Sequence, residues 1–271
     1  MQRRSYKTPS GTIQYRINKV DKDTATLVFL PGLTADHRLF DKQIEYFKNK
    51  YNVFVWDAPG HAESRPFELD FTLTDKARWL RGILEQENIE RPVIVGQSMG
   101  GYVGQMFAEL YPRRLKGFIS IDSTSLQRKY MTGREIWMLK RMDFVFSCYP
   151  WKYLLKAATD GVATTEYGKN LMYEMIMVYD DDRKMYYRIA GHGFRILAKA
   201  IEKDLPYEIK CPALLICGEE DKAGLTVRYN REWHRNTGIP IVWVEDAGHN
   251  ANTDKPDVVN RAIEEFVGKY I

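Results

Sequence analysis

The serine at position 98 stands in a sequence context that favours nucleophilic chemistry. Residues 96–101 have the sequence Gly-Gln-Ser-Met-Gly-Gly, follow the short apolar run 92–95, and lead into a helical pattern that begins at Met99. A side chain at the tip of such a tight strand-to-helix turn sits in strained backbone, and the flanking glycines leave room for it. Its hydroxyl would project over a sheet edge, where a helix N-terminus offers N–H groups to an oxyanion. We therefore predict that Ser98 is a nucleophile rather than a serine that only caps a helix.

A serine nucleophile needs a base, and His249 is the candidate. It follows the predicted strand 240–245, so its loop would lie over the same sheet edge as Ser98. Two aspartates could orient the imidazole, because Asp221 and Asp122 each come directly after a predicted strand. We expect Asp221 to do so, because its strand immediately precedes the one that delivers His249. We expect Asp122 to be held in local hydrogen bonds, and its assignment as the acid stays the alternative.

Strand and helix patterns alternate along most of the chain and predict how these residues are positioned. Short apolar runs bounded by turn residues indicate strands, and amphipathic stretches of helical period indicate helices. Such an alternation is typical of a mostly parallel sheet with helices on both faces. The predicted strands are 12–18, 26–30, 52–56, 92–95, 115–121, 213–217 and 240–245, and the predicted helices are 38–50, 72–87, 99–110, 226–236 and 254–270.

The segment 125–205 breaks this alternation. It has no strand-length apolar run, has a helical pattern, and is rich in methionine and aromatic residues. We interpret it as a helical cap, inserted into a core domain formed by residues 1–124 and 206–271. Most of its apolar side chains must form the interior of the cap, and some are expected to line an apolar pocket over Ser98. Such a pocket favours a small or mid-sized apolar substrate over a polymer.

Composition and charge argue against several other classes of function. Hydrophobic residues make up 44% of the 271 residues and charged residues 28%, which is typical of globular domains. The net charge of +4 is dispersed along the chain, so we expect no nucleic-acid partner. No apolar run approaches the ~18 residues of a membrane span, so we expect no membrane partner either.

Motifs for metals and cofactors are missing from the sequence. The three cysteines, Cys148, Cys211 and Cys217, have no zinc-site spacing, and neither a metal-binding histidine pair nor a glycine-rich dinucleotide motif occurs. We therefore expect neither a metal nor a cofactor. No export signal is visible, which predicts a cytoplasmic location, and nothing in the sequence indicates the oligomeric state.

Four sequence features resemble those of the α/β-hydrolase fold. They are Leu-Pro-Gly-Leu at 30–33, Asp-Ala-Pro-Gly-His-Ala-Glu-Ser at 57–64, the serine motif at 96–101, and Gly-His at 248–249. The second is similar to the family's Asp-x-Pro-Gly-x-Gly-x-Ser turn, with Ala62 in place of the second glycine. The order of serine, acid and histidine along the chain also matches the family.

This resemblance implies a fold, a site and an activity. The fold would be that of an α/β hydrolase over essentially the whole chain. The oxyanion donors would be the N–H groups of Leu33 and Met99, although Pro31 stands where the family's oxyanion loop has histidine. The activity would be that of a serine hydrolase, most simply a carboxylesterase that forms an acyl-enzyme on Ser98. Amides, lactones and carbon–carbon bonds are within reach of the same machinery.

Two other functions are compatible with the sequence. On the same fold, a lyase or dioxygenase without a cofactor could use a histidine alone as its base, with residues 36–38 beside the oxyanion loop. A hydrolase-like ligand receptor would keep the site residues and turn over little substrate. Among the other histidines, His37 and His192 could face the pocket, His61 is expected to stabilise a loop, and His234 is expected to be exposed.

Overall fold

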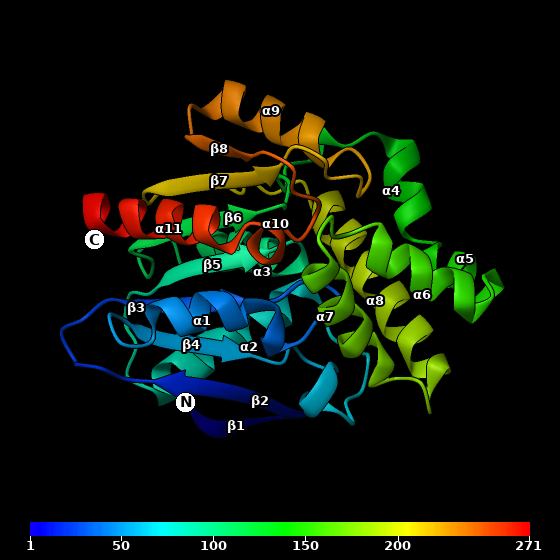
Figure 1. Cartoon of the computed structure of the whole chain (residues 1–271), viewed down its shortest axis with the longest axis horizontal. Coiled ribbons are helices and arrows are strands. Elements are labelled where there is room, and N and C mark those ends of the chain that lie inside the picture. Colours follow the sequence, from blue (N-terminus) through cyan, green and yellow to red (C-terminus); the bar gives the residue numbers. More distant parts are fainter.

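An eight-stranded sheet is the frame on which the other elements are placed (Figure 1). The computed structural model describes residues 1–271. The strands are β1 (Gln2–Thr8), β2 (Gly11–Asn18), β3 (Thr26–Leu30), β4 (Asn52–Trp56), β5 (Val93–Gln97), β6 (Gly117–Ile121), β7 (Ala213–Gly218) and β8 (Ile241–Val244). Their order in the sheet is β1-β2-β4-β3-β5-β6-β7-β8. Strands β1 and β2 run antiparallel to their neighbours, and all pairs from β4 to β8 are parallel.

The hairpin at one sheet edge contains a strand that the apolar pattern does not predict. Strand β1 pairs with β2 along its whole length, from Gln2 opposite Ile17 to Thr8 opposite Gly11. Its sequence is mostly polar and its side chains are mostly exposed, because an edge strand has little apolar surface to cover. A run of apolar residues is therefore a poor signal for this strand.

Helices cover both faces of the sheet and bury two apolar cores. The core-domain helices are α1 (Asp41–Phe47), α2 (Leu73–Gln86), α3 (Met99–Leu110), α9 (Thr226–Thr237), α10 (Ala251–Asp254) and α11 (Pro256–Tyr270). Helices α1, α10 and α11 contribute to one core, and α2, α3 and α9 contribute to the other. Alternate side chains of each buried strand enter different cores, as Leu27 and Phe29 do on one face and Val28 and Leu30 on the other. The fold is the α/β arrangement that the alternation predicts.

Two helices differ from their predicted ranges. The predicted helix 38–50 begins as a 3₁₀ turn, η1 (His37–Phe40), and its α-helical part ends at Phe47. The predicted closing helix 254–270 begins at Pro256 instead, and a separate short helix, α10, precedes it and ends at Asp254. Proline has no N–H to donate to the preceding turn, and its ring disfavours a helical residue before it, so it starts a new helix here.

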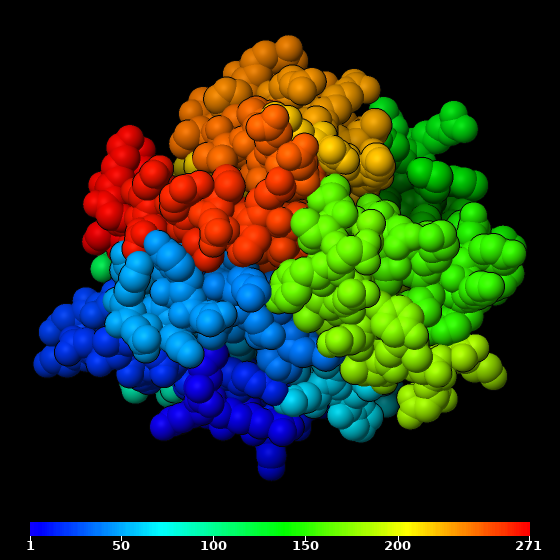
Figure 2. Space-filling view, viewed as in Figure 1, coloured from blue at the N-terminus to red at the C-terminus, as the bar shows by residue number.

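The segment between β6 and β7 contains helices and no strand. Its α-helices are α4 (Gly133–Leu139), α5 (Met142–Cys148), α6 (Trp151–Asp160), α7 (Glu166–Met177) and α8 (Arg183–Glu202), and all five lie within the segment 125–205. They stand at the carboxyl ends of the parallel strands (Figure 1) and cover one end of the molecule, in green in Figure 2. None of the helices of this structure is both long and apolar enough to cross a membrane.

A buried lysine lies on α2, a helix that packs against α8. Lys76 is 1% exposed, and its ammonium group lies 5.6 Å from the centroid of the Phe71 ring. Burial lowers the pKa of Lys76 from 10.5 to about 8. Since an unfolded chain would hold this proton more tightly, the charged lysine costs stability below pH 8, and the cost decreases as the pH rises toward 10.5.

We expect the substitution Lys76→Met to stabilise the protein most at neutral pH. Methionine fills a similar volume without a charge, so the free energy of unfolding should rise by on the order of 3 kcal/mol at neutral pH. The gain should shrink near pH ~10, where the native lysine is already neutral. Urea unfolding at neutral pH and near pH ~10 measures this gain in the free energy of unfolding, with Lys222→Met at an exposed lysine as the control. A gain that is the same at both pH values would contradict this account.

Candidate active site

Ser98 occupies the turn between β5 and α3 in a strained conformation. Its backbone has φ 48° and ψ −116°, a region that residues with side chains rarely adopt. The helix returns so closely over the strand that a Cβ on Gly100 would lie 1.8 Å from the carbonyl oxygen of Leu30. A Cβ on Gly96 would lie 2.4 Å from the backbone of Gly100. Both glycines of the motif are therefore required by close packing, as predicted.

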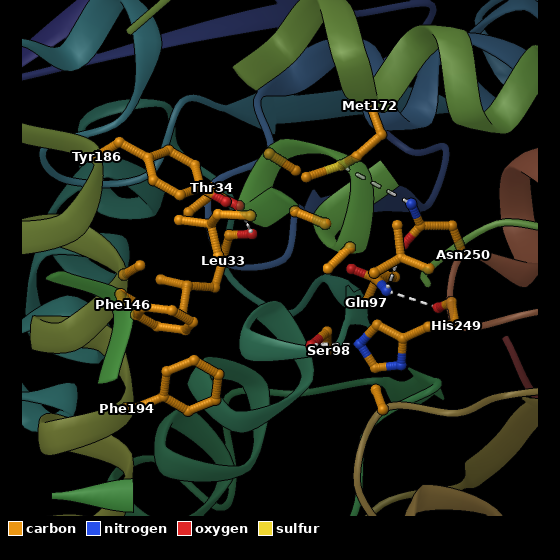
Figure 3. Close-up of a pocket in the computed structure, with 17 residues that line it drawn as sticks. Leu33, Thr34, Gln97, Ser98, Phe146, Met172, Tyr186, Phe194, His249 and Asn250 are labelled. Carbon is orange, nitrogen blue, oxygen red and sulfur yellow. Dashed lines mark hydrogen bonds between the residues drawn. The ribbon is translucent and has the colours of Figure 1, made fainter. Parts of the chain in front are cut away.

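The structure brings the three predicted site residues into one hydrogen-bonded chain. The Nε2 atom of His249 lies 2.9 Å from Ser98 Oγ, and its Nδ1 atom lies 2.8 Å from Asp221 Oδ2. Because a carboxylate only accepts, Nδ1 carries the proton and Nε2 is free to accept one from the serine hydroxyl. The predicted contact between Asp221 and His249 is confirmed. Figure 3 shows Ser98 and His249 side by side at the wall of a cavity.

The electrostatics of this chain favour protonation of the histidine. Burial alone would lower the pKa of His249, but the charge of Asp221 and the hydrogen bond to it outweigh burial. The pKa of His249 is therefore raised above 6.5. A base with such a pKa still accepts a proton near neutral pH, and its imidazolium form is stabilised by Asp221.

Asp122 does not touch the imidazole and instead holds two loops. Its Oδ1 accepts from the N–H of Gly218 at 2.7 Å and its Oδ2 from the N–H of Ala251 at 3.0 Å. These partners are 96 and 129 residues away, so the expectation of local hydrogen bonds was wrong. Burial and then the charge of Asp221 raise the pKa of Asp122 well above its usual range. Asp122 thus links the loop of Asp221 to the loop of His249.

Two further anchors of the histidine loop were not predicted from the sequence. The side-chain amide of Gln97 donates to the carbonyl oxygen of His249 at 2.8 Å and to Asn250 Oδ1 at 3.1 Å. Asp254 accepts from the N–H of Gly248 at 2.9 Å and from the cap at Thr164, also at 2.9 Å. Gln97 is the variable position of the serine motif. Its place directly before Ser98 was the only feature of the sequence that could have indicated its role as an anchor.

The predicted oxyanion donors, the N–H groups of Leu33 and Met99, belong to two backbone segments next to Ser98. The loop after β3 passes so close to it that a Cβ on Gly32 would lie 3.2 Å from Ser98 Cβ. The N–H of Leu33, the next residue, donates to no group within the chain. Met99 is the first residue of α3, so its N–H has no helical acceptor. Both groups are available to an anion, and their role as oxyanion donors stays a prediction.

Two chambers, each of about 270 Å³, meet at the nucleophile. They share Leu33, Ser98, Phe194, Ala223 and His249. The remaining walls of the first chamber are mostly apolar and include Phe146, Leu154, Val162, Met172 and Tyr186, whereas those of the second chamber include Tyr102, Met131, Glu135, Met138, Leu139 and Tyr229. The predicted methionine and aromatic lining from the cap is present, and Figure 3 shows Phe146, Phe194 and Tyr186 around the first chamber.

The other histidines do not line either chamber. His37 lies 2.8 Å from Asp57 Oδ1 through its Nδ1 atom and joins the loop after β3 to the loop after β4. His192 is buried against the ring of Phe71, with the ring centroids 4.6 Å apart. His61 lies 3.1 Å from the carbonyl oxygen of Pro59 and stabilises its own turn, and His234 is exposed on α9. The structure does not bring His37 or His192 to Ser98.

Two clusters of side chains have metal-ligand atoms close together. In the first, Asp36 is bound by Arg38 at 2.7 Å, and Asp57 is occupied by His37. In the second, which also contains Cys217, Asp122 accepts from two backbone N–H groups and Asp221 is bound to His249. Because their carboxylates are already engaged, neither cluster offers an open set of ligands.

Comparison with known proteins places this geometry in a family. The alpha/beta hydrolase family model matches residues 27–262. The chain is 28% identical to an uncharacterized hydrolase of Bacillus subtilis, with 96% of each chain covered. It is 22% identical to 3-oxoadipate enol-lactonase 2 of Acinetobacter baylyi, with 92% of this chain and 90% of the relative covered.

Solved structures show the same fold at low sequence identity. A thermophilic esterase from Thermogutta terrifontis matches with a TM-score of 0.75 and 22% identity, covering 100% of this chain and 99% of that one. A hydrolase from Pseudomonas aeruginosa matches with a TM-score of 0.80 and 19% identity, covering 98% of each. The fold is therefore that of an α/β hydrolase. The chain belongs to the alpha/beta hydrolase family, as its four sequence features predicted.

The pH dependence of covalent labelling of Ser98 tests the hydrogen-bonded chain. A fluorophosphonate reacts with a serine whose proton is removed by a neutral histidine. Since the pKa of His249 is raised, the labelling rate should fall as the pH drops through a value above 6.5. Asp221→Asn should shift this fall in the labelling rate to lower pH and should slow labelling by up to ~10⁴.

The matched control is Asp122→Asn, which keeps the negative charge of Asp221 at the imidazole. This variant should slow labelling far less than Asp221→Asn does. The pH at which its labelling rate falls should stay above the ordinary histidine pKa. The opposite ranking of the two variants, measured by time-resolved gel fluorescence or mass spectrometry, would transfer the role of the acid to Asp122.

Proposed function

We propose that the protein is a serine hydrolase that cleaves a carboxylic ester through an acyl-enzyme. The observation that carries this proposal is the chain of two hydrogen bonds from Ser98 through His249 to Asp221. In this reaction Ser98 Oγ attacks the ester carbonyl while His249 Nε2 takes the hydroxyl proton. The N–H groups of Leu33 and Met99 would stabilise the resulting oxyanion. His249 then gives the proton to the departing alkoxide, which leaves as the alcohol.

The second half of the reaction restores the enzyme. A water molecule enters where the alcohol was, His249 takes one of its protons, and the hydroxide attacks the acyl carbonyl. The tetrahedral intermediate collapses, the bond to Ser98 Oγ breaks, and the proton on His249 returns to the serine. Asp221 keeps its charge throughout and stabilises the imidazolium each time it forms.

The walls of the cavity support a substrate that carries no carboxylate. Several relatives are hydrolases whose names specify dicarboxylates, such as 3-oxoadipate enol-lactonase and a succinate derivative hydrolase. A carboxylate taken out of water needs a basic side chain or several donors. No lysine or arginine lines either chamber of this protein. We infer an ester with an apolar arm in the first chamber, and a lactone would be cleaved by the same steps.

Replacement of the nucleophile should abolish this activity. Ser98→Ala should lower the turnover of p-nitrophenyl esters by at least ~10³, because it removes the atom that forms the acyl-enzyme. The protein should stay folded, since the serine occupies strained backbone and contributes little stability. A panel of p-nitrophenyl esters with different acyl chain lengths measures the loss, with Ser5→Ala as the control at a distant exposed serine. Near-full turnover by the purified Ser98→Ala variant would exclude the proposed function.

A further inference from the structure

The second chamber differs from the first in having an unpaired carboxylate in its wall. Glu135 stands in the first turn of α4, and its Oε1 accepts from the hydroxyl of Tyr229 at 2.5 Å. Its Oε2 accepts from the N–H of Thr132 at 2.7 Å, which closes a capping box at the start of the helix. No lysine, arginine or histidine forms an ion pair with Glu135; the nearby Arg228 is bound to Glu232 at 3.1 Å instead.

The carboxylate is charged at neutral pH. Burial alone would raise the pKa of Glu135, but hydrogen bonds from Thr132 and Tyr229 outweigh burial and lower it. Glu135 is half-buried, so water screens its charge less than that of a fully exposed carboxylate. No lysine or arginine lines the second chamber, and His249, which does, is bound to Asp221 rather than to Glu135.

The rest of the second chamber suits an apolar cation better than a hydrated one. Its walls include the aromatic rings of Tyr102, Phe194 and Tyr229 and the side chains of Met131 and Met138. Ring faces attract cations, and alkyl groups bury well against methionine. Asp122 also lines this chamber, but its two carboxylate oxygens accept from the N–H groups of Gly218 and Ala251. The carboxylate of Glu135 together with aromatic and aliphatic walls matches an alkylammonium group, whose charge is spread over methyl groups.

We propose that the second chamber binds an alkylammonium group carried by one arm of the substrate, while the other, apolar arm fills the first chamber. This proposal rests on the proposed function, because it places the scissile ester at Ser98 between the two arms. It names a substrate class, an ester of an alkylammonium alcohol or acid. Glu135 acts here as a specificity-determining residue and takes no part in the proton transfers.

The test compares esters that differ only in charge. Choline butyrate is paired with its carbon analogue, in which a tert-butyl group replaces the trimethylammonium group. A second pair carries the same two groups at the end of the acyl chain of a p-nitrophenyl ester. The two pairs together test an alkylammonium group on the alcohol side and on the acid side of the ester. In the native protein, kcat/KM for the cationic member of at least one pair should exceed that for its neutral analogue.

Glu135→Gln isolates the charge, because glutamine also closes a capping box and keeps the start of α4. It should lower the cationic-to-neutral ratio of kcat/KM by about tenfold. Tyr229→Phe frees a carboxylate oxygen from its donor and should raise the ratio. The control is Glu265→Gln, at an exposed residue of α11, which should not change the ratio. The proposal would be overturned if Glu135→Gln left the cationic-to-neutral ratio of kcat/KM unchanged in both pairs.

Failure of the proposed function would give a different result. In that case neither member of any pair would be turned over faster by the native protein than by Ser98→Ala. Binding then decides the question by calorimetry with choline and its uncharged carbon analogue. Tighter binding of choline that Glu135→Gln removes would uphold the alkylammonium site, and equal binding of the two compounds would overturn it.

Discussion

The reversal of the chain at Ser98, from a strand to a helix within one residue, is the constraint on which the site depends. It is possible only because α3 packs back onto β5 and β3 with no side chain between them at Gly96 and Gly100. The strained backbone at Ser98 costs about 1–3 kcal/mol and is held by the surrounding sheet. In return the hydroxyl stands clear of the sheet and next to the N-terminus of α3. Every other part of the site is arranged around this fixed point.

The base and acid reach this point from loops, so their positions must be fixed by other means. Asp122 binds the backbone at the start of the Asp221 loop and just after His249, and Gln97 binds the carbonyl of His249 itself. Each anchor comes from the end of a different parallel strand. The neighbouring carboxyl ends of β5, β6 and β7 are therefore followed by Ser98, Asp122 and Asp221 in turn. A rotation of the imidazole would have to break hydrogen bonds on both sides of it.

Sequence motifs were sufficient for the elements and residues whose chemistry is local. The serine motif predicted the strained turn at Ser98, and the order of strands predicted that His249 and Asp221 meet at one sheet edge. The loss of alternation predicted the helices between β6 and β7. The apolar pattern missed strand β1, whose sequence is polar because it lies at the edge of the sheet and pairs with β2 alone. The motifs also failed where a contact joins distant segments. The hydrogen bonds of Asp122 depend on partners 96 and 129 residues away, and no spacing along the chain encodes such a contact.

The cap and the oxyanion loop are too close to move independently. A Cβ on Gly193 of α8 would lie 2.3 Å from the side chain of Leu33, so the helix packs directly against the residue that is predicted to supply an oxyanion donor. The next residue, Phe194, lines both chambers. A displacement of α8 that widened either chamber would therefore also remove packing from the oxyanion loop. Since α4 also belongs to this helical segment and carries Glu135, the segment that would select the substrate under our proposal also packs against the loop of Leu33.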